Sequence, residues 1–398
     1  MRILAIVSLA TLAATITFAP ATARITKAPP QVTKQIIKLE TVAEALNHPW
    51  GLAFLPNGNI LVTERAGRMR VISSNGKLSR PLRGVPAVYT SEQGGLLDVV
   101  LTPDFPSSGM IYFSYSEPLG RGKSRTAVAR ARLIMHEDGG GLDGLQIVFR
   151  QEPAQATVGA FGSRIQFMSD GSLFITLGDR DVREQAQNPA NHLGNLVRVL
   201  PDGRPHPENP RLEGWLPEVW SIGHRNIQAI ALHPTSGRAW TVEHGARGGD
   251  EINVPEAGRN YGWPVITYGR DYDRRKIGEG TKKPGLEQPI YYWNPSIAPS
   301  AAIFYSGNLF PEWKGNLLVS ALAGEALHRL VLNGEEVVGE EVLIKEFGER
   351  LRNVREGPDG AIWLLTDHPK GQVLRMVPSQ TSGCSTKKVV FIPERKNC

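Results

Sequence analysis

Short apolar segments that follow a glycine-containing polar turn recur along this chain. Six units share the pattern, and they begin at Leu55, Phe105, Met168, His233, Trp313 and Gly357. In "SDGSLFITLGDR" and "GPDGAIWLLTD" the glycine suits a tight turn, and the apolar, β-branched or aromatic residues that follow suit a strand. Helical amphipathic patterns of useful length are nearly absent. The sequence therefore predicts an all-β protein built from repeated hairpins.

The number of repeats predicts a six-bladed β-propeller, because blades that cannot bury both faces alone pack around a common axis. The propeller is expected over residues 42–378, with a lead-in at 24–41 and a tail at 379–398. The repeats are unevenly spaced, so long loops should decorate one face, and function is expected there. A large β-sandwich or a two-domain β protein is the alternative.

The N-terminal segment has the pattern of an export signal, and the C-terminal tail holds the two cysteines of the chain. Arg2, the apolar run "ILAIVSLATLAATITFA" and the small residues at Ala21–Ala23 are typical of a cleaved signal peptide, here residues 1–23. A membrane anchor would need about 20 apolar residues, whereas this run is shorter and ends at Pro20. The sequence therefore predicts a periplasmic or secreted protein. There Cys384 and Cys398 could form a disulfide in the tail, with two free thiols as the alternative.

Charge adds little to this description. The formal net charge is +6, and the 45 basic residues are scattered. The pattern indicates a solvated basic surface that can help to hold an anionic small molecule, rather than a nucleic-acid stripe or a membrane segment.

Several loops place polar side chains beside glycine. Gln93 precedes two glycines, Arg164 follows "AFGS", and Arg225 and Asn226 stand in "GHRNIQ". Arginine presents a planar fork that suits carboxylates and quinone oxygens. For Gln93 the alternative is an ordinary surface turn, and for the arginines it is a buried structural ion pair.

The segment from Glu243 to Gly269 is the densest in candidate ligands. Glu243, Asp250 and Glu251 lie among glycines, an arrangement that suits a hard cation such as Ca²⁺ but not zinc. Further on, "GERLRNVREGPDG" contains Arg350, Arg352 and Arg355, which we expect on one face of an extended segment. Like charges so placed need an anion or carboxylates between them.

These segments together carry a resemblance. "HPWGLAFLPNGNILVTER", "QGGLLDVVLTPDF", "GHRNIQ", "EHGARGGDEIN", "GRNYGWP" and "LRNVREGPDGAIWLLTD" are similar to the soluble glucose/sorbosone dehydrogenase family, over about Val42 to Pro378. The nearest branch resembles the periplasmic aldose sugar dehydrogenases that use pyrroloquinoline quinone (PQQ). The resemblance implies PQQ and Ca²⁺ as cofactors, an aldose sugar as substrate, and oxidation at the anomeric carbon. No haem-attachment CxxCH is present, so electrons would pass to an external acceptor.

The resemblance also implies roles for single residues. Positions that hold PQQ correspond to Gln93, Arg225, Asn226, Arg350 and Arg352, and we add Arg164 from the polar loops. The backbone carbonyls of Gly245 and Ala246 would bind the PQQ calcium, although the family usually has proline at position 246. A second, structural Ca²⁺ is expected near Glu251 and Tyr261.

One position departs from the family in a way that bears on catalysis. The catalytic base is a histidine in "HFG-S/G-R", but this chain reads "AFGSR", with Ala160 in its place. Alanine accepts no proton, and His224 and His244 are the candidate substitutes. Smaller departures are Ala301 and Ala302 in place of bulkier residues, and Ala323 and Glu325 where a basic residue is frequent.

Three functions therefore stay open from the sequence. The first is a PQQ-dependent sugar dehydrogenase with an altered or reduced activity. The second is a propeller that binds PQQ, sugar or another anionic ligand without turnover, which Ala160 favours. The third is a structural propeller that has lost its ligand, against which the retained Arg225, Asn226, Arg350 and Arg352 weigh.

Overall fold

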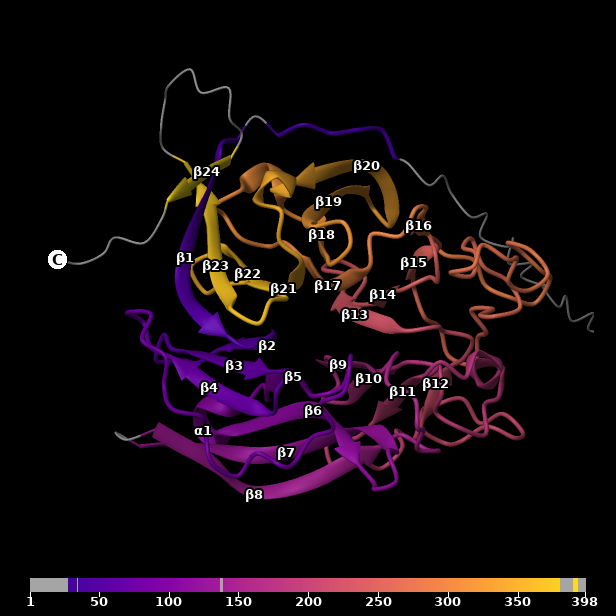
Figure 1. The fold of residues 1–398 in the computed structure, drawn as a ribbon. Coiled ribbons are helices and arrows are strands. Elements are labelled where there is room, and N and C mark those ends of the chain that lie inside the picture. The colour runs from indigo at the N-terminus through magenta and orange to yellow at the C-terminus, as the bar shows by residue number, and fades with distance from the viewer. Residues whose placement is uncertain (1–27, 34, 137–138, 380–388, 393–398) are drawn as a thin grey trace, which may run out of the picture.

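The structure is a computed structural model that describes residues 28–33, 35–136, 139–379 and 389–392. The expected signal segment, Cys384 and Cys398 lie outside these ranges. The strands form six sheets arranged as a ring (Figure 1). The predicted six-bladed β-propeller is therefore confirmed, and the sandwich and two-domain alternatives are wrong. Within the described ranges, no helix has the length and apolar character needed to cross a bilayer.

Each blade is an antiparallel sheet, apart from one parallel pair of strands in blade 6, and its innermost strand lies nearest the axis. Blade 1 contains β2 (Pro49–Phe54), β3 (Ile60–Glu64) and β4 (Arg68–Ile72). Blade 2 contains β5 (Leu96–Leu101), β6 (Met110–Pro118), β7 (Ser124–His136) and β8 (Gly139–Arg150). Blade 3 contains β9 (Gly162–Phe167), β10 (Leu173–Leu177), β11 (Leu196–Val199) and β12 (Val219–Ser221).

The second half of the ring follows the same plan. Blade 4 contains β13 (Ile227–Leu232), β14 (Ala239–Glu243), β15 (Asp250–Asn253) and β16 (Tyr291–Trp293). Blade 5 contains β17 (Pro299–Phe304), β18 (Leu317–Ala321), β19 (Ala326–Asn333) and β20 (Glu336–Leu343). Blade 6 contains β21 (Leu351–Glu356), β22 (Ile362–Thr366), β23 (Gly371–Pro378), β1 (Ile37–Leu46) and β24 (Val389–Ile392). The helical turns are α1 (Phe105–Ser108), η1 (Arg183–Gln187), η2 (Pro311–Trp313) and η3 (Lys345–Phe347).

The six innermost strands share one irregularity. β2, β5, β9, β13, β17 and β21 contact one another in that order around the ring, and β21 returns to β2. Each shifts register against the second strand of its blade near its own start. A bulge of this kind re-aims side chains locally. The irregularity therefore recurs around the axis at the end where the inner strands begin.

Alternating side chains build the core between neighbouring blades. Because successive residues of a strand point to opposite faces, Tyr112 packs against blade 3 while Phe113 packs against blade 1. Leu317 and Leu318 divide in the same way between blades 4 and 6. The apolar hairpins of the sequence thus become six inter-blade cores, one for each blade interface.

The two ends of the described chain close the ring together. β1 pairs antiparallel with β23, from Ile37 opposite Pro378 to Leu46 opposite Gly371. Figure 1 shows this indigo strand beside the yellow strands of blade 6. Blade 6 is therefore completed by a strand from the other end of the sequence.

Candidate functional site

A polar cavity of about 520 Å³ opens at the end of the propeller where the inner strands begin. We call it the axial cavity. Every blade contributes to its wall, so the loops that the sequence singled out converge. The lining residues are His48, Trp50, Arg65, Glu92, Gln93, Leu97, Gly162, Gln228, His244, Tyr272, Ala298, Leu322, Arg350, Arg352 and Asp367.

Positive charge prevails in this wall. Arg65, Arg350 and Arg352 face the carboxylates of Glu92 and Asp367. Arg352 donates from Nη2 to Asp367 Oδ2 over 2.8 Å, yet its buried Nε has no hydrogen-bond partner among the residues that the structure describes. A buried guanidinium N–H without a partner is costly, so the cavity is suited to an anion that would accept from Arg352.

Asp367 is the counter-ion of this group. Burial raises the pKa of Asp367, but the charges of Arg352 and Arg65 and hydrogen bonds from His48 and Arg352 outweigh burial and hold the pKa below its usual range. The ring Nδ1 of His48 lies 3.0 Å from Asp367 Oδ1. Asp367 therefore stays ionised and orients both the histidine and Arg352.

Ala160 lies behind the cavity wall, beside Gln93. The backbone N–H of Ala160 donates to Gln93 Oε1 over 2.9 Å. Ala160 is 3% exposed and has φ of 49°, a left-handed conformation in which histidine is more frequent than alanine. Gly162 has φ of 64°, and a Cβ there would lie 2.6 Å from the Leu177 backbone. The turn of "AFGSR" thus combines a left-handed residue at position 160 with a glycine that no larger residue can replace without a backbone shift.

Arg225 and Asn226 support the cavity from blade 4. The Arg225 guanidinium donates to the carbonyl oxygen of Gly245 through a short hydrogen bond. Asn226 is 2% exposed, and its Oδ1 accepts from the N–H of Gly162 over 3.0 Å. Neither side chain lines the axial cavity. In this structure Asn226 positions the Gly162 turn, and Arg225 forms a hydrogen bond with the Gly245 carbonyl.

Acidic side chains fix the glycine-rich loop of blade 4. Asp250 accepts from the N–H groups of Gly245, Ile297 and Ala298, at 2.7 to 3.0 Å. Through these bonds one carboxylate positions both a predicted calcium ligand and a residue of the cavity wall. The predicted partner Ala246 is buried in a small apolar cluster.

Glu251 has little compensation for its charge. Within the described part of the chain, its carboxylate accepts one hydrogen bond, from Asn253 Nδ2 over 3.3 Å. Burial and the charge of Glu243 raise its pKa well above the usual value. The hydroxyl of Tyr261 donates to Val254 O and accepts from the N–H of Glu256. The phenol oxygen of Tyr261 is therefore already engaged on both sides, which leaves the Glu251 carboxylate as the free acidic group of this pair.

Arg164, which we expected to bind the cofactor, instead joins the blades at the axis. Its guanidinium donates to Asp98 Oδ1 over 3.0 Å and lies 3.9 Å from the Trp50 ring centroid. It also donates to three backbone carbonyls, those of Gln228, Ser300 and Arg352. These partners come from the five other blades, and burial lowers the pKa of Arg164 to about 9.

The expectation that Arg350, Arg352 and Arg355 lie together is wrong for Arg355. Arg350 and Arg352 line the axial cavity, but Arg355 lines a separate cavity at the other end of the axis, 3.3 Å from Asp98. β21 shifts register between Leu351 and Asn353, so strict alternation fails there, and Arg355 lies farther along the strand than Arg352 and reaches the other end of the axis.

The departures at four other positions also lie away from the axial cavity. Ala301 and Ala302 are buried in inter-blade cores. Ala323 and Glu325 are exposed, and neither lines the cavity. The cations of the cavity wall therefore come from blades 1 and 6 rather than from this loop.

The candidate substitute histidines differ in their surroundings. His224 is fully buried, and its two ring nitrogens contact Glu243 and Ser221 at 2.9 Å. His244 lines the axial cavity, but its Nε2 contacts the Pro299 carbonyl at 2.7 Å. Burial and the charge of Arg225 lower the pKa of His244 to about 3.

Sequence reasoning missed His48, Arg65 and Asp367 as cavity residues. A usable signal was present, because a charged residue directly follows the second strand in blades 1 and 6. Arg65 follows β3, and Asp367 follows β22. His48 precedes the inner strand of blade 1 and has φ of 47°. Only the ring closure shows that His48 and Asp367 are neighbours.

The fold and this site define a six-bladed propeller with a cationic cavity at one end of its axis. The glucose/sorbosone dehydrogenase family model matches residues 46–375, and the chain therefore belongs to this family. Aldose sugar dehydrogenase YliI of Escherichia coli (strain K12) is 42% identical over 347 residues, covering 86% of this chain and 93% of the relative.

Solved structures agree with this assignment. A crystal structure of a glucose dehydrogenase matches with a TM-score of 0.83 and 46% identity, covering 86% of this chain and 99% of that one. The apo form of a soluble aldose sugar dehydrogenase from Escherichia coli matches with a TM-score of 0.83 and 42% identity, covering 86% of this chain and 100% of that one. A PQQ-bound aldose sugar dehydrogenase from Streptomyces coelicolor matches with a TM-score of 0.72 and 30% identity, covering 88% and 100%.

Proposed function

We propose that this protein oxidises aldose sugars at the anomeric carbon with PQQ, at a rate reduced by the alanine at position 160. The observation that carries the proposal is the cationic axial cavity with the unpartnered Nε of Arg352. The Streptomyces coelicolor relative is named as PQQ-bound and as an aldose sugar dehydrogenase. Electrons would leave to an external acceptor, and the site of action would be the periplasm after removal of residues 1–23.

The residues of the cavity fit PQQ, a quinone that carries carboxylates. Its volume lies in the range of ligand sites, and guanidinium forks pair well with carboxylates. Gln93, Arg350 and Arg352 would hold the cofactor, and Arg65 adds a further cation. When bound, PQQ supplies the hydride acceptor of the reaction.

The calcium positions fit under one condition. The carbonyl oxygen of Gly245 already faces a cation, the Arg225 guanidinium. A calcium ion bound by the carbonyls of Gly245 and Ala246 would therefore require Arg225 to release this bond, which frees its fork for the quinone. The poorly compensated carboxylate of Glu251 favours a second cation near Tyr261.

We assign the proton-accepting role to His48. The carboxylate of Asp367 accepts from its Nδ1–H, so Nε2 is the ring nitrogen left to accept the hydroxyl proton of the sugar. An oriented histidine in contact with a carboxylate is the usual arrangement of a general base. His244 is the weaker acceptor because its pKa is lowered to about 3. This replaces His224 and His244 as the preferred substitutes.

A second function is binding without turnover, and the alanine at position 160 favours it. The turn and the bond between Gln93 and Ala160 retain the architecture of the site without the base. A propeller of this kind would bind PQQ and sugar as a sensing or carrier module.

The two functions are distinguished by one experiment. The mature chain is mixed with PQQ and Ca²⁺, and cofactor binding is followed by its absorbance while dye reduction is followed with a panel of aldoses. Binding with dye reduction supports the dehydrogenase. Binding without dye reduction selects the second function. Absence of both signals contradicts both functions.

A further inference from the structure

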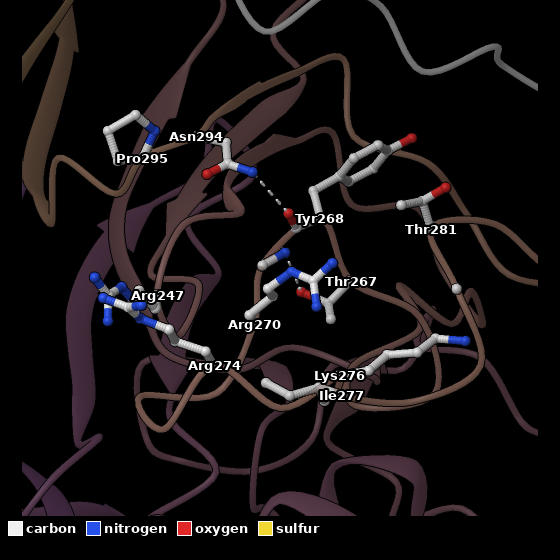
Figure 2. A pocket seen from close by; sticks show the side chains of 12 residues that line it. Arg247, Thr267, Tyr268, Arg270, Arg274, Lys276, Ile277, Thr281, Asn294 and Pro295 are labelled. Atoms are coloured by element: carbon white, nitrogen blue, oxygen red, sulfur yellow. Dashed lines mark hydrogen bonds between the residues drawn. The ribbon is translucent and has the colours of Figure 1, made fainter.

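The loop insertion between β15 and β16 forms a second hollow of about 700 Å³, which we call the basic pocket. Figure 2 shows Arg270 in the middle of this view, with Arg247 and Arg274 to one side and Lys276 to the other. The residues that line it include no carboxylate; they are Arg247, Thr267, Tyr268, Gly269, Arg270, Arg274, Lys276, Ile277, Gly280, Thr281, Asn294 and Pro295.

Backbone pairing forces three of these cations into one row. Arg247 and Arg270 exchange both backbone hydrogen bonds, at 2.8 and 3.3 Å, so they are directly opposite each other. Arg270 pairs in turn with Lys276 across a short hairpin. Residues opposite each other in an antiparallel pair point to the same face, and like charges so placed repel.

The carboxylates nearby in sequence do not relieve this repulsion. Asp271 pairs with Arg183 at 3.0 Å, Asp273 pairs with Arg275, and Glu279 pairs with Lys283 at 2.9 Å. Among the hydrogen bonds and ion pairs of the described residues, none involves the guanidinium of Arg247, Arg270 or Arg274. Positive charge is therefore held together here by the backbone and left uncompensated.

The pocket also contains a neutral hydrogen-bond donor and apolar lining residues. Thr267 is 7% exposed, and its Oγ1 accepts from the N–H of Gly269 over 3.1 Å, so its own proton is available. The buried Ile277 and the exposed Pro295 give the pocket an apolar part. We propose that the basic pocket binds a small molecule with two or more oxyanion groups, phosphate or carboxylate, through Arg247, Arg270 and Arg274.

This site is distinct from the axial cavity but shares a wall with it. The hairpin that holds Arg270 and Lys276 carries Tyr272 at its tip, and Tyr272 lines the axial cavity. An anion bound to one face of the hairpin would therefore lie next to the cavity without occupying it.

Titration calorimetry on the mature chain tests the proposal, with inorganic pyrophosphate and citrate as probes in low-salt buffer without calcium. We expect at least one probe to bind at micromolar to millimolar concentration, and binding to weaken as salt is added. Arg270→Gln should raise Kd at least about tenfold, because a charge-assisted hydrogen bond is lost. Tighter binding of one probe identifies the ligand as a phosphate or a carboxylate.

Two matched variants guard against binding elsewhere. Arg80→Gln removes an equal charge from an exposed position outside the pocket and should change Kd less than about twofold. Arg350→Gln removes a cation of the axial cavity and should also leave binding intact. The proposal is overturned if neither probe binds at about 10 mM, if Arg80→Gln weakens binding as much as Arg270→Gln, or if only Arg350→Gln abolishes it.

Discussion

The side-chain oxygen of Gln93 accepts a hydrogen bond from the backbone N–H of Ala160 over 2.9 Å. This bond joins a predicted cofactor ligand to the position where the family has its catalytic base. Because the bond uses only the backbone of residue 160, the turn keeps its place whichever side chain it carries. A histidine introduced at position 160 would therefore leave this bond intact.

Ala160→His should raise the rate of dye-linked aldose oxidation at least about tenfold, because a positioned general base typically contributes about 10²–10⁴-fold. The left-handed backbone at this position suits histidine. Steady-state rates with PQQ and Ca²⁺ measure the effect. Ala160→Asn is the control, since asparagine also suits this conformation but accepts no proton. Equal gains for both variants would exclude a base at this position.

His48→Asn should lower the residual kcat of the PQQ-loaded protein by about 10²-fold, with little change in PQQ affinity. The same substitution should have a much smaller effect when combined with Ala160→His, because the second histidine then supplies the base. The double-mutant cycle in kcat measures this coupling. Additive effects of the two substitutions would refute the role of His48.

Arg164→Met should lower the free energy of unfolding by about 3–5 kcal/mol, because the buried carboxylate of Asp98 loses its main cationic partner. Arg164→Lys should be only partly tolerated, since an ammonium cannot replace a fork that reaches five blades. Urea titration followed by tryptophan fluorescence gives the values. Arg204→Gln, at an exposed pair with Asp202, should change stability by less than about 0.5 kcal/mol.

Asp367→Asn should cost about 2–4 kcal/mol of stability at pH 7, and the cost should shrink as the pH falls. The folded-state pKa of Asp367 lies below the unfolded value near 3.8. Its stabilising effect is thus complete above that value and is lost as the carboxylate is protonated at lower pH. Urea titrations from pH 7 to pH 3 test this, with the exposed Asp143→Asn as control. A pH-independent difference would contradict the assignment.

The repeated turns and strands of the sequence predicted the fold, since six hairpin units need a ring to bury both faces. The axial cavity was predicted in part. Gln93, Arg350 and Arg352 were found through local motifs, because each stands beside a glycine turn or in an extended run. The function of Arg164 was not visible, since its partners come from strands of five other blades. The pairing of His48 with Asp367 depends on ring closure, which no local pattern encodes.

Blade 6 takes β1 from one end of the sequence and β23 from the other. A partly synthesised chain therefore cannot close the ring of blades. The apolar faces of its first and last blades stay uncovered until β23 has been made. The ring can therefore close only after the last strands of blade 6 have been made. His48 and Asp367 meet only at that seam, so the proposed proton acceptor comes into being with the last step of assembly.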